Sequence, residues 1–114
     1  MTVRDLAERL QLKILAGEDA TDRDVQGCYT GDLLSWVMGR AQEGDAWLTV
    51  MGNINAIAVA TLADTACIIL TENAPLDEAA RQKAQQQQVA VLQTEENSYH
   101  TAIHIHQLLG DGSE

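Results

Sequence analysis

The hydrophobic and polar positions of the chain follow two different periods. Apolar residues recur three and four positions apart at Val3, Leu6 and Leu10, which indicates a helix that Thr2 can cap. Short, continuously apolar runs such as residues 67–70 indicate strands of a sheet that is covered on both faces. Helices are predicted at 3–10, 32–41, 54–63, 74–88 and 98–109, and strands at 13–16, 25–30, 46–51, 67–70 and 89–92.

Helix and strand alternate with short connections from residue 32 onward. This order predicts an α/β fold, a three-layer sandwich whose central sheet of about five strands is mainly parallel or mixed and carries helices on both faces. The order and direction of the first strands stay open, because they precede the regular alternation. With 114 residues the chain suits a single domain, expected at 1–110, and residues 111–114 are expected to form a disordered tail.

The acidic charge of the chain argues against some classes of binding partner. The net charge of −10, with only seven dispersed Lys and Arg residues, argues against nucleic acid and against an anionic membrane surface. An anionic ligand would have to rely on backbone amides and helix N-termini. The first residues do not resemble a signal peptide, and the longest apolar run, residues 56–63, is too short to span a membrane. A cytoplasmic location is therefore expected.

The sequence carries few signs of catalysis. Cys28 and Cys67 lie 39 positions apart without a metal-binding spacing, so both are expected to be reduced, packed thiols. No phosphate loop, dinucleotide fingerprint or G-x-S-x-G motif is present. We therefore expect no catalytic residue and no cofactor. A small enzyme that uses Cys28, or an acid pair such as Asp32 and Glu72, is the least favoured alternative.

A small ligand would bind where the predicted strands end, since helix N-termini point there. The segments at these ends include 30–32, 51–55, 71–73 and 93–95. The competing interpretation is plain helix capping by Asp32, Asn53 and Asn73. A nucleotide sensor built on Thr30, Asn53, Asn55 and Thr71 is a second alternative. The candidate ligand residues are Thr30, Gly31, Asp32, Gly52, Asn53, Asn55 and Thr71.

The final predicted helix contains three histidines. His100 and His104 are four positions apart and could share a metal ion, but a helical projection places both on the polar face and provides no third ligand beyond the nearby Glu95 and Glu96. No metal site is therefore expected. The same projection places His106 on the apolar side, together with Tyr99, Ala102, Ile103 and Leu109.

Two predicted helices have more apolar surface than a small monomer can bury. Trp36 lies on a helix with a broad apolar face, and the helix around Ile57 is apolar almost all the way round. Such excess commonly marks a subunit interface, so a homodimer is expected; the alternative is a monomer in which both helices pack on the sheet. The candidate interface residues are Trp36, Val37, Ile54, Ile57 and Ala58.

One segment supports a family resemblance. Residues 21–34 read T-D-R-D-V-Q-G-C-Y-T-G-D-L-L, in which Asp22, Arg23 and Gly27 match the signature of the DRTGG domain, while Gln26 and Cys28 replace its Thr and its second Gly. The chain resembles this family over nearly its whole length, and the fold implied is that of the N-terminal domain of HPr kinase. Such domains accompany phosphotransacetylases and CBS-domain-containing pyrophosphatases, where catalysis resides in another domain. The resemblance implies a regulatory or dimerisation unit. Together with the apolar helices and the lack of catalytic motifs, it leads us to expect a stand-alone, non-catalytic regulatory module that homodimerises, with a small molecule or a protein as a candidate partner.

Overall fold

The computed structural model describes residues 1–110, and the predicted tail, residues 111–114, lies outside the described residues. One five-stranded sheet has the order β1-β5-β4-β3-β2. Its strands are β1 (Lys13–Ala16), β2 (Gly27–Thr30), β3 (Asp45–Thr49), β4 (Cys67–Leu70) and β5 (Val91–Gln93). Strands β2 to β5 are parallel, and β1 pairs antiparallel with β5 at one edge. The predicted mixed sheet is confirmed, and its one antiparallel strand is the first.

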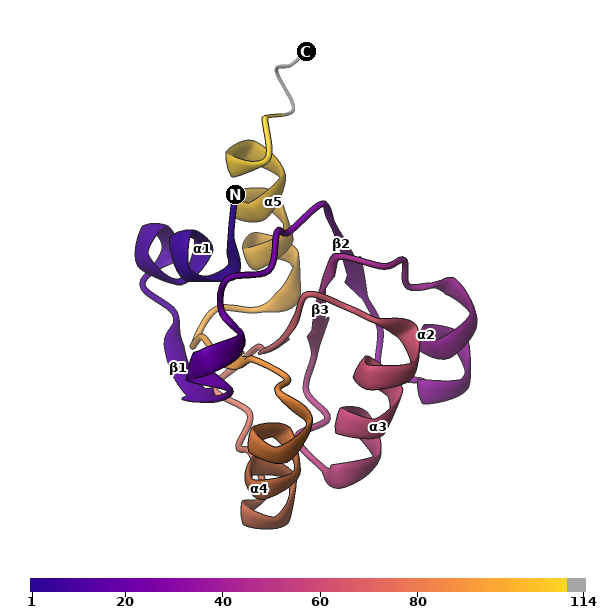
Figure 1. Ribbon diagram of the computed structural model, residues 1–114. Helices are drawn as coiled ribbons and strands as arrows, with labels where there is room; N and C mark the ends of the chain where they lie inside the picture. Colours follow the sequence, from indigo (N-terminus) through magenta and orange to yellow (C-terminus); the bar gives the residue numbers. More distant parts are fainter. Residues whose placement is uncertain (111–114) are drawn as a thin grey trace.

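Helices cover both faces of this sheet, as Figure 1 shows. One face carries α1 (Val3–Leu10) and α5 (Ser98–Leu108), and the other carries α2 (Leu34–Arg40), α3 (Ile54–Ala63) and α4 (Glu78–Gln87). A short 3-10 helix, η1 (Glu18–Ala20), follows β1. The expected three-layer α/β sandwich is therefore confirmed.

The alternation of side chains along the central strands builds two cores. Leu48 and Ile69 pack in the core beneath α1 and α5, whereas Trp47 and Ile68 pack beneath α2, α3 and α4. These four side chains are at most 1% exposed. Trp47 can be buried because its indole N–H donates to the backbone oxygen of Gly31 at 2.9 Å.

Local sequence accounts for the starts of α1, α3 and α5, and the Asn97 side chain accepts from the His100 N–H at the last of these. Thr2 and Asp5 form a reciprocal capping box at α1, and the Asn53 side chain accepts from the Ala56 N–H at the start of α3, as predicted. The prediction that Asp32 and Asn73 cap helices is wrong. Helix α2 begins at Leu34 without a side-chain cap, and Asn73 has a φ of 58° in the turn after β4, ahead of α4.

Candidate functional site

A cleft lies at the carboxyl ends of β4 and β5. The connection after β4 leads to α4 on one face of the sheet, whereas the connection after β5 leads to α5 on the other. Where the connections from neighbouring parallel strands part in this way, a crevice opens that commonly binds ligands. Two adjoining cavities of about 290 and 550 Å³ lie here and share Leu10, Gln11 and Thr94.

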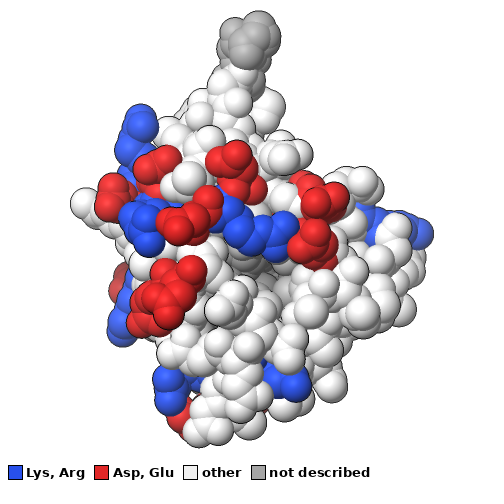
Figure 2. Space-filling model, viewed as in Figure 1, with Lys and Arg blue, Asp and Glu red and all other residues white. Residues whose placement is uncertain are grey.

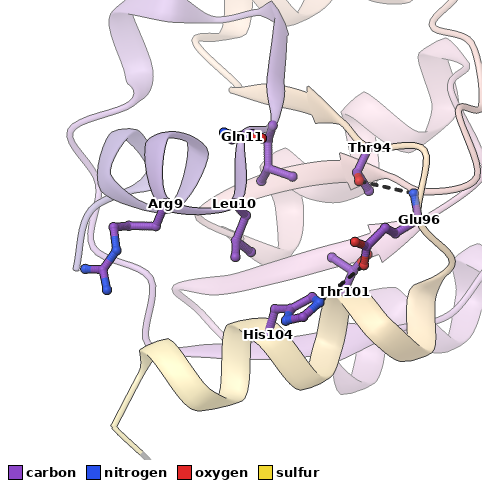
Figure 3. A pocket seen from close by; sticks show the side chains of 8 residues that line it. Arg9, Leu10, Gln11, Thr94, Glu96, Thr101 and His104 are labelled. Atoms are coloured by element: carbon purple, nitrogen blue, oxygen red, sulfur yellow. Dashed lines mark hydrogen bonds and ion pairs between the residues drawn. The ribbon is translucent and has the colours of Figure 1, made fainter.

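The antiparallel edge strand completes the cleft, because it brings the end of α1 and the start of β1 to the carboxyl edge of the parallel strands. Figure 3 shows the smaller cavity, with Thr101 and His104 on α5 and Leu10 and Gln11 at the end of α1. The residues lining this cavity are Arg9, Leu10, Gln11, Leu12, Thr94, Glu96, Thr101 and His104. The larger cavity is lined by Leu10, Gln11, Lys13, Asn73, Gln93, Thr94 and Glu95.

Backbone bonds hold the two loops that border the cleft together. The Glu72 N–H donates to the Glu96 oxygen, and the Asn73 N–H donates to the Thr94 oxygen, both at 2.8 Å. Glu72 and Asn73 both have positive φ, so the turn after β4 is tight and fixed in place. Glu96 also pairs with His104 across the cleft wall, with 3.4 Å between Nε2 and Oε1.

The predicted ligand residues lie mainly along the other half of this edge. The connections after β2 and β3 both lead to helices on the same face of the sheet, α2 and α3. The loop after β2 packs against the loop after β3. The Asp32 carboxylate accepts from the Thr49 hydroxyl at 2.7 Å and from the Val50 N–H at 3.0 Å. The backbone oxygen of Gly31 accepts the hydrogen bond from the Trp47 indole N–H, and Thr30 is exposed.

The remaining predicted ligand residues also have contacts within the chain. The Gly52 oxygen accepts from the Asp77 N–H at 2.8 Å, and Asn53 caps α3. Thr71 is fully buried and its hydroxyl bonds to that of Ser98 at 2.8 Å, whereas Asn55 is exposed on α3. A ligand role for these residues stays a prediction. Of the strand-end segments, 93–95 does line the cleft, while residues 9–13 could not be placed there because the sequence does not give the direction of β1.

The face assignment is wrong for His106, whereas His100 is exposed as predicted. Thr101 and Ile105 are the buried residues of α5, His106 is exposed, and His104 lies on the wall of the cleft with its side chain 45% exposed. The Thr101 hydroxyl donates to the Asn97 oxygen, so this polar residue can be buried on the helix. Within residues 1–110, no group of three His, Cys, Asp or Glu side chains is placed to hold a metal ion.

An exposed apolar patch covers α2 and α3. Ile54, Ala58 and Leu62 are spaced by four residues and form one outward stripe of α3, with Ile54 46% and Leu62 70% exposed. Trp36, on the neighbouring α2, is 53% exposed and carries the Arg40 guanidinium 3.8 Å above its ring. We call Trp36, Ile54, Ala58 and Leu62 the α2–α3 patch.

Two of the predicted interface residues belong to the interior instead. Val37 and Ile57 are at most 1% exposed and pack with Trp47 in the core beneath α2 and α3. Their side chains face the sheet because each helix must bury one side against it. Only Trp36, Ile54 and Ala58 of the predicted set are available to a partner.

The signature segment stabilises the opposite edge of the sheet. Asp22 pairs with Arg4 at 2.8 Å. Arg23 donates to the backbone oxygens of Thr65 and Asp64 at 2.8 and 3.2 Å and pairs with the Asp64 carboxylate at 3.0 Å, which ties the segment to the end of α3. Asp22 and Arg23, which match the motif, therefore have structural contacts here and do not line the cleft.

The cysteines are poor nucleophiles. Burial raises the pKa of Cys28 to about 11 and that of Cys67 to about 12, and both thiols are free. Because the thiolate is the reactive form, an enzyme based on Cys28 is disfavoured. No described helix has the length and apolar character needed to cross a membrane.

The fold defines a mixed α/β domain whose cleft lies where the helix connections part. The sequence profile of the DRTGG domain matches residues 5–108, so the chain belongs to the DRTGG domain family, a family of regulatory domains. The search of curated proteins gave no match.

Among solved structures, the chain is similar to the CBS and DRTGG domains of the regulatory region of Clostridium perfringens pyrophosphatase, which were crystallised with the activator diadenosine tetraphosphate. The TM-score is 0.73 and the identity is 13%; the likeness covers 93% of this chain and 46% of that one. At this identity it shows the fold alone.

Proposed function

We propose that this protein is a non-catalytic regulatory module that homodimerises through the α2–α3 patch and binds a small ligand. The observation that carries the proposal is the exposed stripe of Ile54, Ala58 and Leu62 beside Trp36. Contiguous apolar surface of this kind usually marks an interaction site. Trp is also the residue type most enriched among the side chains that dominate binding energy.

Charge favours a second copy of the chain as the partner. Two copies of a chain with a net charge of −10 repel each other, so association is least opposed where acidic side chains are absent. Helix α3 contains no charged residue, and α2 contains only Arg40. In Figure 2 the charged side chains lie mostly in a band across the upper half and down the left side of the view, and the region over α3 at the lower right is largely uncharged.

A two-fold arrangement suits this patch. In such a dimer the same surface is used by both copies, so the α3 stripe of one protomer would pack against that of its partner. Closely spaced helices favour small residues at the crossing point, and Ala58 lies between the larger Ile54 and Leu62.

One substitution with a matched control tests the dimer. Ala58→Glu places a carboxylate in the centre of the patch, whereas Ala79→Glu places the same group at an exposed alanine on α4. Light scattering at equal concentration is expected to give a dimer for the parent and for Ala79→Glu and a monomer for Ala58→Glu. Equal masses for all three proteins would contradict the assigned interface.

The regulatory part of the proposal rests on family membership. The regulatory region of the C. perfringens pyrophosphatase, similar in fold, was crystallised with an activator. The raised thiol pKa of Cys28 supports a non-catalytic role. Free cysteines are usual in the reducing cytosol, where we expect the protein to act, and its acidity disfavours nucleic acid as a partner.

A further inference from the structure

We propose that the larger cavity of the cleft binds a zwitterionic α-amino acid with an uncharged polar side chain. Lys13 holds its carboxylate, and Glu95 holds its ammonium group. This inference rests on the proposed function, since it identifies the class and the site of the small ligand. It also places the ligand away from the ends of β2 and β3, where most of the ligand residues predicted from the sequence lie.

The larger cavity is lined by one cation and one carboxylate. Lys13 lies at the start of β1, and Glu95 lies in the connection between β5 and α5. Both residues are exposed, and neither forms an ion pair with another residue in the range 1–110. Two unpaired charges of opposite sign on one cavity suit a ligand that itself carries a group of each sign.

An ion of one sign alone is not favoured in this cleft. In the smaller cavity Glu96 is already paired with a histidine of α5, and Figure 3 shows the Arg9 side chain directed away from the other lining residues. Lys13 and Glu95 balance each other in the larger cavity. Glu72, exposed in the adjacent turn, adds a negative charge that opposes an anion. A ligand without net charge therefore fits this charge balance best.

The other side chains that line the larger cavity suit a polar, uncharged ligand side chain. Three of them are the amides of Gln11, Asn73 and Gln93, and a fourth is the hydroxyl of Thr94. Because an amide both donates and accepts hydrogen bonds, this lining can pair with a side-chain amide of the ligand. Leu10 can cover the methylene groups of such a side chain. The cavity volume of about 550 Å³ lies in the usual range for small-molecule sites.

The wall of this cavity is held in place by bonds within the chain. Glu72 and Asn73 have φ of 55° and 58° although neither is glycine, and such conformations are concentrated at ligand sites. The Asn73 N–H donates to the Thr94 oxygen at 2.8 Å, and the Gln93 amide donates to the Ala74 oxygen at 2.9 Å. These bonds fix the turn after β4 against the end of β5. A rigid wall lowers the cost of ordering the site when a small ligand binds.

Isothermal titration of the purified full chain with L-glutamine tests the assignment. Two relatives of this ligand each lack one of its charges: the methyl ester lacks the carboxylate, and N-acetyl-L-glutamine lacks the ammonium group. Each is expected to bind at least tenfold more weakly than L-glutamine, which corresponds to about 1.4 kcal/mol. Either relative binding as tightly as L-glutamine would show that the site does not use both charges, and the inference would fall.

Two substitutions assign each charge of the ligand to one residue. Lys13→Gln is expected to weaken L-glutamine binding about tenfold and not to weaken binding of the methyl ester, which has no carboxylate to hold. Glu95→Gln is expected to weaken L-glutamine binding by a similar factor and not to weaken binding of N-acetyl-L-glutamine. Lys83→Gln is the matched control, because it removes an unpaired cation from α4, outside the lining of both cavities, and is expected to leave every affinity unchanged.

Absence of binding by L-glutamine and by the shorter L-asparagine and L-serine would overturn the inference, as would equal losses for Lys13→Gln and Lys83→Gln. Failure here is distinguishable from failure of the proposed function. If the parent scatters as a dimer and binds none of these amino acids, only the ligand assignment falls. A parent that is a monomer would contradict the proposed assembly whatever the titration shows.

Discussion

Replacing Gly52 by alanine tests whether this glycine serves packing rather than ligand binding. An alanine Cβ at position 52 would overlap the carbonyl oxygen of Pro75 and lie 3.0 Å from its carbonyl carbon and 3.1 Å from the Cα of Leu76. These are backbone atoms, so the segment before α4 would have to move as a whole. The move would also strain the 2.8 Å bond from the Asp77 N–H to the Gly52 oxygen.

The expected cost combines these two effects. Overpacking costs about 1–3 kcal/mol, and loss of a hydrogen bond costs about 0.5–1.5 kcal/mol. We therefore expect Gly52→Ala to lower the free energy of unfolding by about 1.5–4.5 kcal/mol, which for a domain of this size lowers Tm by about 6–18 °C.

Thermal and urea unfolding followed by circular dichroism measure the effect. The matched control is Gly39→Ala, since a Cβ at Gly39 in α2 meets no atom within 4 Å. That variant is expected to be as stable as the parent or more stable by about 0.5–1 kcal/mol, because alanine favours the helix. A Gly52→Ala protein within about 0.5 kcal/mol of the parent would refute the packing argument and restore Gly52 as a candidate for close approach to a ligand.

Two other substitutions and labelling experiments follow from the same structure. Arg23→Ala is expected to destabilise the fold by about 1.5–3 kcal/mol, because it removes charged hydrogen bonds to two backbone oxygens, whereas Arg4→Ala removes an exposed pair and is expected to cost about 0–1 kcal/mol. Equal costs in urea unfolding would contradict the structural role of the signature arginine. Cys28, whose pKa is raised to about 11, is expected to react with a thiol reagent at pH 8 about 100-fold more slowly than a free cysteine, and Cys67 more slowly still. Labelling of the folded protein at the rate seen in denaturant would contradict this.

The fold was largely predictable because each element has a clear local pattern. The continuous apolar run at 67–70 is a strand buried on both faces, and the capping box of Thr2 and Asp5 begins the first helix. Boundaries shifted where a side chain had a better partner at long range. Asp32 was expected to open a helix, but its carboxylate bonds to Thr49 and Val50, which lie far away in the sequence.

The candidate site was less predictable, for a reason of topology. The sequence predicts that a ligand binds at the ends of the strands, but it does not show which face of the sheet each following helix covers. The cleft forms only between β4 and β5, where α4 and α5 lie on opposite faces, and it includes Gln11 and Lys13 only because β1 is antiparallel. A helical projection of α5 likewise missed that the buried side is set by Thr101 and Ile105.

The mass of the particle in solution tests the central claim most directly. Sedimentation equilibrium of the parent chain at micromolar concentrations is expected to give twice the 12.4 kDa mass of one chain. The α2–α3 patch is the one place where we propose that two acidic chains can meet. A single species at 12.4 kDa across the whole concentration range would contradict the account.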